Sequence, residues 1–124
     1  METAATPTIL IADDNDDLRS VLAEVLREHG YRVLEAATGE EALAFTDEPL
    51  VLVVADIVMP PEGGVAIVDE LKRRVAGLKA LFISGYGALP LGSGSVDPVL
   101  SKPFSSHELL SRIAALVPAK SEAA

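Results

Sequence analysis

Five side chains with complementary chemistry stand directly after apolar runs of the sequence: Asp13, Asp14, Asp56, Ser84 and Lys102. Three carboxylates that lie close together repel one another, and a divalent cation relieves that repulsion. Mg²⁺ suits such a site because it prefers a few carboxylates together with waters and a phosphate oxygen. If the fold brings the five side chains together, they form an acidic site that binds a magnesium ion beside a phosphoryl group.

The same residue types suit one reaction, the attack of a carboxylate on a phosphoryl group to give an aspartyl phosphate. Asp56 is the expected nucleophile, and it needs no general base because an aspartate is already ionised at neutral pH. Lys102 adds a compact positive charge, and Ser84 adds a hydroxyl that can hydrogen-bond an incoming oxygen.

The stretch that presents Asp56 is an apolar run from Leu50 to Ala55, rich in β-branched valine. Such a run is typical of a strand that is buried on both faces. The ligands of open α/β sheets bind outside the carboxyl ends of the strands. We therefore expect Asp56 at the functional edge of a sheet.

The other apolar runs alternate with stretches of helical periodicity. Further strands are predicted at 8–12, 31–36, 80–83 and 99–101. Helices follow the first, second, third and fifth strands, with capping residues at Asn15, Thr38 and Ser105. The alternation predicts an α/β fold, a flavodoxin-like doubly wound parallel sheet of five strands in the order 2-1-3-4-5. That order makes strands 1, 3, 4 and 5 neighbours and gathers the five side chains at one edge.

The connection between the fourth and fifth strands is unusual in composition. Residues 85–97 contain four glycines and one proline. In a helix interior each glycine costs about 1 kcal/mol and a proline about 3 kcal/mol relative to alanine. The segment is long enough to cross back over the sheet, so its fourth helix is predicted to be shortened or irregular.

Length and composition limit the possible classes of protein. A chain of 124 residues allows one domain, predicted to span 1–124 with an ordered core of about 8–117. Its apolar runs are too short to span a membrane, and its N-terminus lacks the features of a secretory signal. The absence of cysteine makes a reducing cytoplasm the default compartment. A net charge of −9 disfavours binding to nucleic acid.

In their order and joint occurrence, these motifs resemble a two-component response-regulator receiver domain. The likeness covers nearly the whole chain and rests on Asp13-Asp14, the run from Asp56 to Pro60, Ser84, the run Lys102-Pro103-Phe104, and Gly64 eight residues past Asp56. It implies that Asp56 is the phospho-acceptor and that Ser84 and Lys102 contact the phosphoryl group. It assigns metal binding to three carboxylates and one backbone carbonyl, those of Asp13, Asp14, Asp56 and Val58.

The resemblance also implies a function. A sensor histidine kinase or a histidine phosphotransfer protein would donate the phosphoryl group, and phosphorylation would switch interactions with a downstream protein. The chain would be a phospho-acceptor rather than an enzyme, with weak self-dephosphorylation at most. Two alternative roles for the chain are a phosphate sink and the receiver piece of a hybrid kinase.

Two departures from the family pattern concern output. Val99 stands where most receiver domains carry an aromatic residue, and the glycine- and proline-rich segment 85–97 replaces the usual fourth helix. The run from Phe82 to Tyr86 resembles a subclass of single-domain receivers that reads Phe-Ala-Thr-Gly-Tyr. That subclass is associated with sensor kinases of the HWE type, which makes such a kinase a candidate partner.

Three other classes of protein fit the sequence less well. A haloacid-dehalogenase-like phosphatase also forms an aspartyl phosphate, but its motif after the first strand fails at Asp17-Leu18. A calcium loop of the EF-hand type lacks the required glycine and terminal glutamate. A pseudo-receiver that only binds a partner is disfavoured because the chain retains all five site residues.

Overall fold

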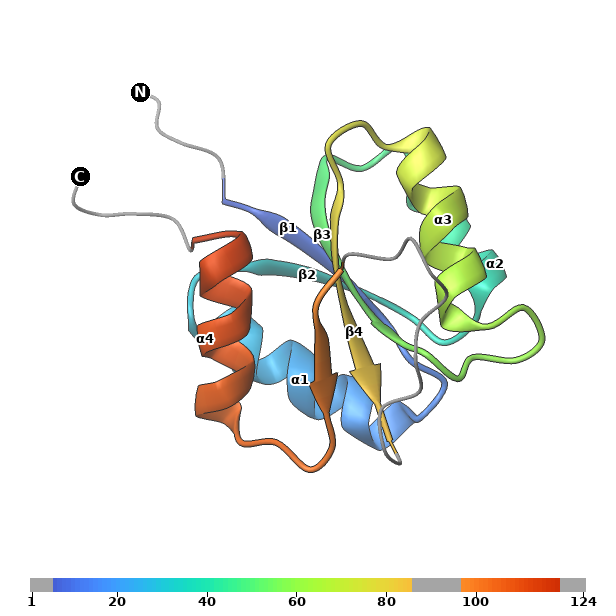
Figure 1. Cartoon of the computed structure of the whole chain (residues 1–124). Helices are drawn as coiled ribbons and strands as arrows, with labels where there is room; N and C mark the ends of the chain where they lie inside the picture. The colour runs from blue at the N-terminus through green and yellow to red at the C-terminus, as the bar shows by residue number, and fades with distance from the viewer. Residues whose placement is uncertain (1–5, 86–96, 119–124) are drawn as a thin grey trace, which may run out of the picture.

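Five parallel strands in the order β2-β1-β3-β4-β5 form the centre of the computed structural model, which describes residues 6–85 and 97–118 (Figure 1). The elements follow one another along the chain as β1 (Thr8–Ala12), α1 (Asp16–Glu28), β2 (Arg32–Ala36), α2 (Gly39–Leu43), β3 (Leu50–Asp56), α3 (Gly64–Arg74), β4 (Lys79–Ser84), β5 (Val99–Ser101) and α4 (Ser106–Leu116). The predicted strand order is therefore confirmed. The predicted irregularity of the fourth crossover concerns segment 85–97, of which residues 86–96 lie outside the described residues.

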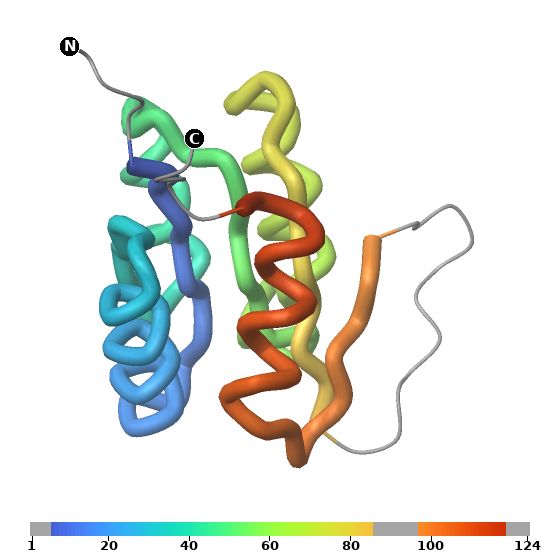
Figure 2. The backbone as a smooth tube through the Cα atoms, turned by 90° about the vertical axis from the view of Figure 1, so that its left-hand side faces the viewer, coloured from blue at the N-terminus to red at the C-terminus, as the bar shows by residue number. Residues whose placement is uncertain are grey.

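The two faces of the sheet carry separate apolar cores, because successive side chains of a strand point to opposite faces. On β1, Ile9 and Ile11 pack with the buried side chains of α1 and α4, whereas Leu10 and Ala12 pack with those of α2 and α3. Figure 1 shows α1 and α4 on one side of the sheet and α2 and α3 on the other. Figure 2 views the sheet from the side that α1 and α4 cover.

The predicted helix caps are present. The side chain of Asn15 accepts a hydrogen bond from the backbone N–H of Leu18 at the start of α1. Thr38 caps α2 and Ser105 caps α4 in the same way, each through the N–H three residues on. These bonds satisfy backbone donors that the first turn of a helix leaves free, so they fix where each helix begins.

The strand ends face one edge because all five strands are parallel. At that edge the backbone N–H of Ile57 donates to Ile83 O (2.9 Å), and the N–H of Lys102 donates to Ser84 O (2.8 Å). These bonds continue the sheet just past β3 and β5. In the part of the chain that the structure describes, no helix is long and apolar enough to cross a membrane.

Tyr31 ties the opposite end of the sheet to α4, since its buried hydroxyl donates to Val117 O at 2.7 Å. We expect Tyr31→Phe to lower the free energy of unfolding by about 1 kcal/mol, because the phenylalanine leaves a largely buried carbonyl without its donor. Urea denaturation followed by circular dichroism measures this. An unchanged unfolding midpoint would show that the bond contributes nothing.

Candidate functional site

Asp13 is the first residue after β1, and its polar groups are held from several directions. Its backbone N–H donates to Ala36 O at the end of β2 (3.1 Å). Its carboxylate Oδ1 accepts from the N–H of Asn15 (2.9 Å), the residue that caps α1. The side chain is 1% exposed. The carboxylate therefore has a fixed orientation in a buried position.

The second carboxylate oxygen of Asp13 is unusual. Asp13 Oδ2 is buried and has no hydrogen-bond partner among the residues that the structure describes. Burial raises the pKa of this carboxyl above its ordinary value, and the charge of Asp56 adds to that effect, against the hydrogen bond from Asn15. A buried acceptor without a donor is costly, and a bound cation would satisfy it.

Asp56 ends β3 and lies beside Asp13. Its side chain is held by two groups, since Oδ1 accepts from the N–H of Val58 at 2.9 Å and Oδ2 lies 3.5 Å from Lys102 Nζ. Asp56 is 8% exposed, so only a small part of it is accessible to solvent. The lysine therefore places a positive charge beside this carboxylate.

Asp13, Asp14 and Asp56 together form a candidate cation site. One carboxylate oxygen from each lies within 4.8 Å of the others, and Asp14 is exposed at the mouth of the group. All three donors are oxygens, which are the ligands that Mg²⁺ prefers. The orphaned Oδ2 of Asp13 adds a separate reason to expect a cation here. The residues present therefore fit a magnesium ion.

Ser84 and Lys102 complete the group at the ends of β4 and β5. The backbone bond between them places both at the edge where Asp56 ends β3. Ser84 is 3% exposed, whereas the lysine side chain is about one-third exposed and reaches Asp56. The structure thus brings the predicted carboxylates and amine into contact range and places the hydroxyl at the same strand edge. Val58, predicted to offer its carbonyl, follows in the loop after β3.

Gly64 has a physical role that its spacing from Asp56 alone did not reveal. Its N–H donates to Ile57 O (2.8 Å), which closes the loop after β3. A Cβ at this position would overlap the backbone oxygen of Asp56 and lie 2.9 Å from its carbonyl carbon. The start of α3 therefore packs directly against the backbone of Asp56, and only glycine allows that approach.

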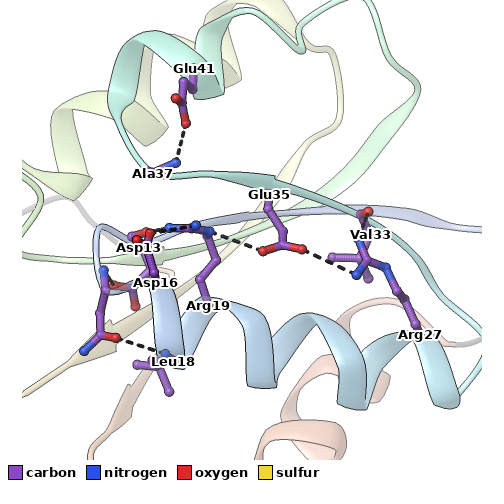
Figure 3. A network of polar contacts seen from close by, with 10 residues as sticks. Asp13, Asp16, Leu18, Arg19, Arg27, Val33, Glu35, Ala37 and Glu41 are labelled. Atoms are coloured by element: carbon purple, nitrogen blue, oxygen red, sulfur yellow. Dashed lines mark hydrogen bonds and ion pairs between the residues drawn. The ribbon is translucent and has the colours of Figure 1, made fainter.

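Arg19 is a residue of the site that sequence reasoning missed. Its guanidinium donates to Asp13 O at 2.8 Å and pairs with Asp16 and Glu35 (Figure 3). One signal was available: a cation in the first turn of a helix is disfavoured by the helix dipole. An arginine placed there, three residues after an aspartate, indicates a local contact that outweighs this effect.

The comparison with known families agrees with this geometry. The family model for the response regulator receiver domain matches residues 9–114. The chain belongs to this family. The chain is therefore a receiver domain of two-component signal transduction. Receiver domains bind magnesium at an acidic pocket, and this chain has an acidic group of three aspartates at the strand edge.

Several known proteins resemble this receiver domain. It is 36% identical over 110 residues to the response regulator receiver protein CpdR of Brucella abortus, covering 85% of this chain and 92% of CpdR. It is 35% identical over 116 residues to the transcriptional regulatory protein CpxR of Klebsiella pneumoniae, covering 88% of this chain and 48% of CpxR. The receiver domain therefore spans about half the length of that regulator.

A solved structure of another receiver domain has the same fold. The crystal structure of the receiver domain from the hybrid histidine kinase CckA superposes with a TM-score of 0.76 at 32% sequence identity. The match covers 89% of this chain and 98% of that one. The flavodoxin-like architecture predicted from the alternation of strands and helices is thus found in a related receiver domain.

Proposed function

We propose that Asp56 accepts a phosphoryl group from a sensor histidine kinase or a histidine phosphotransfer protein in a reaction that requires Mg²⁺. The observation that carries this proposal is the gathering of three carboxylates within 4.8 Å, with Lys102 3.5 Å from Asp56. The chain is then a phospho-acceptor rather than an enzyme. In this proposal the receiver domain spans 1–124, and its phosphorylation switches its interactions with other proteins.

In the proposed step, an Asp56 carboxylate oxygen attacks phosphorus as the phosphorus–nitrogen bond to the donor imidazole breaks. The electron pair of that bond stays on the imidazole nitrogen, and the phosphoryl group becomes an acyl phosphate on Asp56. A bound Mg²⁺ would neutralise charge on the transferring oxygens, and Asp13, Asp14, Asp56 and the carbonyl of Val58 would hold it.

The other residues of the chain position and stabilise the group. Lys102 lies near enough to Asp56 to leave it and pair with a phosphoryl oxygen. Ser84, buried at the end of β4, offers a hydroxyl donor to a second oxygen. Both residues would thus stabilise the negative charge that develops on the phosphoryl oxygens. Such electrostatic stabilisation is the main contribution that a protein makes to this reaction.

The proposal is tested by incubating the protein with acetyl phosphate and following its intact mass. We expect the mass of one added phosphoryl group in the presence of MgCl₂ and no addition when EDTA is in excess. Alkaline hydroxylamine should remove the group, because it cleaves acyl phosphates. Labelling that persists in EDTA would contradict a role for the metal.

The raised pKa of Asp13 predicts a pH dependence of magnesium binding. Protons compete with the cation for this carboxylate, so affinity should fall by about tenfold per pH unit once the pH drops below the raised pKa. The loss therefore begins at a higher pH than it would for an ordinary aspartate. Calorimetric titration with MgCl₂ over a series of pH values measures this, and affinity that stays constant down to the ordinary pKa would contradict it.

The same shift predicts a trend in stability without metal. A raised pKa means that the folded protein binds the Asp13 proton more tightly than the unfolded chain does. The resulting stabilisation is complete below the ordinary pKa and is lost as the pH rises through the raised value. MgCl₂ should therefore stabilise the protein more above the raised pKa, where the buried carboxylate is ionised, than below it.

Different relatives support two different roles for this receiver domain. The likeness to CpdR supports a regulator made of a receiver domain, and the likeness to the CckA receiver supports a piece of a hybrid kinase or a phosphate sink. Phosphotransfer profiling against the histidine kinases of the source organism measures how fast each kinase transfers its phosphoryl group. The cognate donor is the kinase with the fastest transfer. A kinase of the HWE type remains our candidate. Tyr86, part of the motif behind that proposal, lies outside the described residues.

A further inference from the structure

The guanidinium of Arg19 reaches back from α1 to the loop that carries Asp13 and Asp14. Its Nη1 donates to Asp13 O at 2.8 Å, its Nη2 lies 2.8 Å from Asp16 Oδ1, and its Nε lies 3.3 Å from Glu35 Oε1. The side chain is only 15% exposed. Figure 3 shows the guanidinium between the loop after β1 and the neighbouring strand β2.

These contacts complete the support of Asp13. Its N–H is bound to Ala36, its Oδ1 to Asn15 and its carbonyl oxygen to Arg19. Asp13 Oδ2 is the remaining polar atom, and within the described residues nothing binds it. The surrounding hydrogen bonds therefore fix both the backbone and the side-chain plane of Asp13, and they leave one oxygen for a cation.

Glu35 anchors this arrangement to the sheet. It lies on β2 and pairs with Arg19 through one carboxylate oxygen and with Arg27 through the other (3.4 Å). Arg27 in turn donates to Val33 O on the same strand (2.9 Å). The network thus fastens two turns of α1 to the edge strand, but Arg19 alone of the two arginines contacts Asp13.

We propose that Arg19 is a positioning residue of the cation site, which holds the Asp13 backbone so that Oδ2 faces the metal. The proposal rests on the proposed function, since it assumes that Asp13 binds Mg²⁺. Residues that orient a metal ligand commonly change metal affinity by about 10- to 100-fold when they are removed. Arg19 would act through hydrogen bonding and not through its charge.

The charge of Arg19 and its hydrogen bond to Asp13 O are expected to change magnesium affinity in opposite directions. A positive guanidinium near the site repels a divalent cation, so removing the charge alone would tighten magnesium binding. Removing the support of Asp13 would weaken it. Arg19→Met deletes both the charge and the donors, and Arg27→Met is the matched control that loses the same charge from the same network.

We expect Arg19→Met to raise the Kd for Mg²⁺ by about tenfold in calorimetric titration of the full chain, whereas Arg27→Met changes it less than about twofold. Both variants lose an ion pair with Glu35, so a similar loss of stability in the two would not explain a difference in affinity. The magnesium-induced shift of the Asn15 amide resonance should also be smaller in Arg19→Met at concentrations that just saturate the wild type.

Arg19→Lys provides the test if the methionine variant does not fold. Lysine keeps the charge but offers one nitrogen, which cannot contact Asp13, Asp16 and Glu35 together, so we expect a weakening of about threefold. Unchanged or tighter binding in the variant that folds would overturn the role of Arg19. If wild-type protein did not bind Mg²⁺, or if Asp13→Asn bound it equally well, the proposed function itself would fail.

Discussion

Asp56→Asn is expected to reduce labelling by acetyl phosphate to background, a loss of at least about 100-fold. The amide is nearly the same size as the carboxylate, so it still accepts the hydrogen bond from Val58 and fits the same buried space. It is neutral, however, and lacks the oxygen nucleophile that the reaction needs. Intact mass after incubation with acetyl phosphate and MgCl₂ measures the loss directly.

The matched control for this substitution is Asp47→Asn, because Asp47 is an exposed aspartate outside the site. It undergoes the same chemical change and should be labelled at the wild-type rate. Peptide mapping of the labelled wild-type protein should place the phosphoryl group on Asp56. Wild-type labelling of Asp56→Asn, or a label on another residue, would refute the assignment of the nucleophile.

Gly64→Ala is expected to lower the free energy of unfolding by about 3 kcal/mol, at the upper end of the cost of overpacking. The added methyl group would overlap the backbone oxygen of Asp56, and its other close neighbours are also backbone atoms, which cannot rotate away. The start of α3 must therefore shift relative to β3. Urea denaturation followed by circular dichroism gives the free energy.

Gly85→Ala is the control, since a Cβ at Gly85 meets nothing within 4 Å in the described structure. It also lies next to a site residue, so it controls for proximity to the strand edge. We expect its stability to stay within about 0.5 kcal/mol of the wild type. Equal stability of Gly64→Ala and Gly85→Ala would show that the contact between α3 and Asp56 is easily relieved.

The topology was predictable because the local signals agree with one another. The valine-rich run before Asp56 has the composition of a doubly buried strand, and β3 is indeed central in the sheet. The caps at Asn15, Thr38 and Ser105 depend on side chains within three residues, so sequence alone locates them. Parallel strand order then follows from the few topologies that right-handed crossovers permit.

The gathering of the candidate site residues was predictable, whereas the contacts that support them were not. Asp13 and Lys102 follow strands, Asp56 ends one, and the strand ends of a parallel sheet meet at one edge. The contact of Arg19 with Asp13 O depends on the direction of a long side chain, and the close approach of Gly64 to Asp56 depends on how α3 packs. Neither is encoded in periodicity. The expected irregular crossover stays a prediction, because residues 86–96 are not described.

One strand edge is proposed to hold a metal ion beside a phosphoryl group on Asp56. A crystal structure with MgCl₂ and beryllofluoride, which imitates an acyl phosphate, tests this directly. We predict the fluoride adduct on Asp56, with Mg²⁺ against Asp13 and with Lys102 turned to a fluorine. An adduct on another carboxylate, or a magnesium ion bound away from Asp13 and Asp56, would contradict the account.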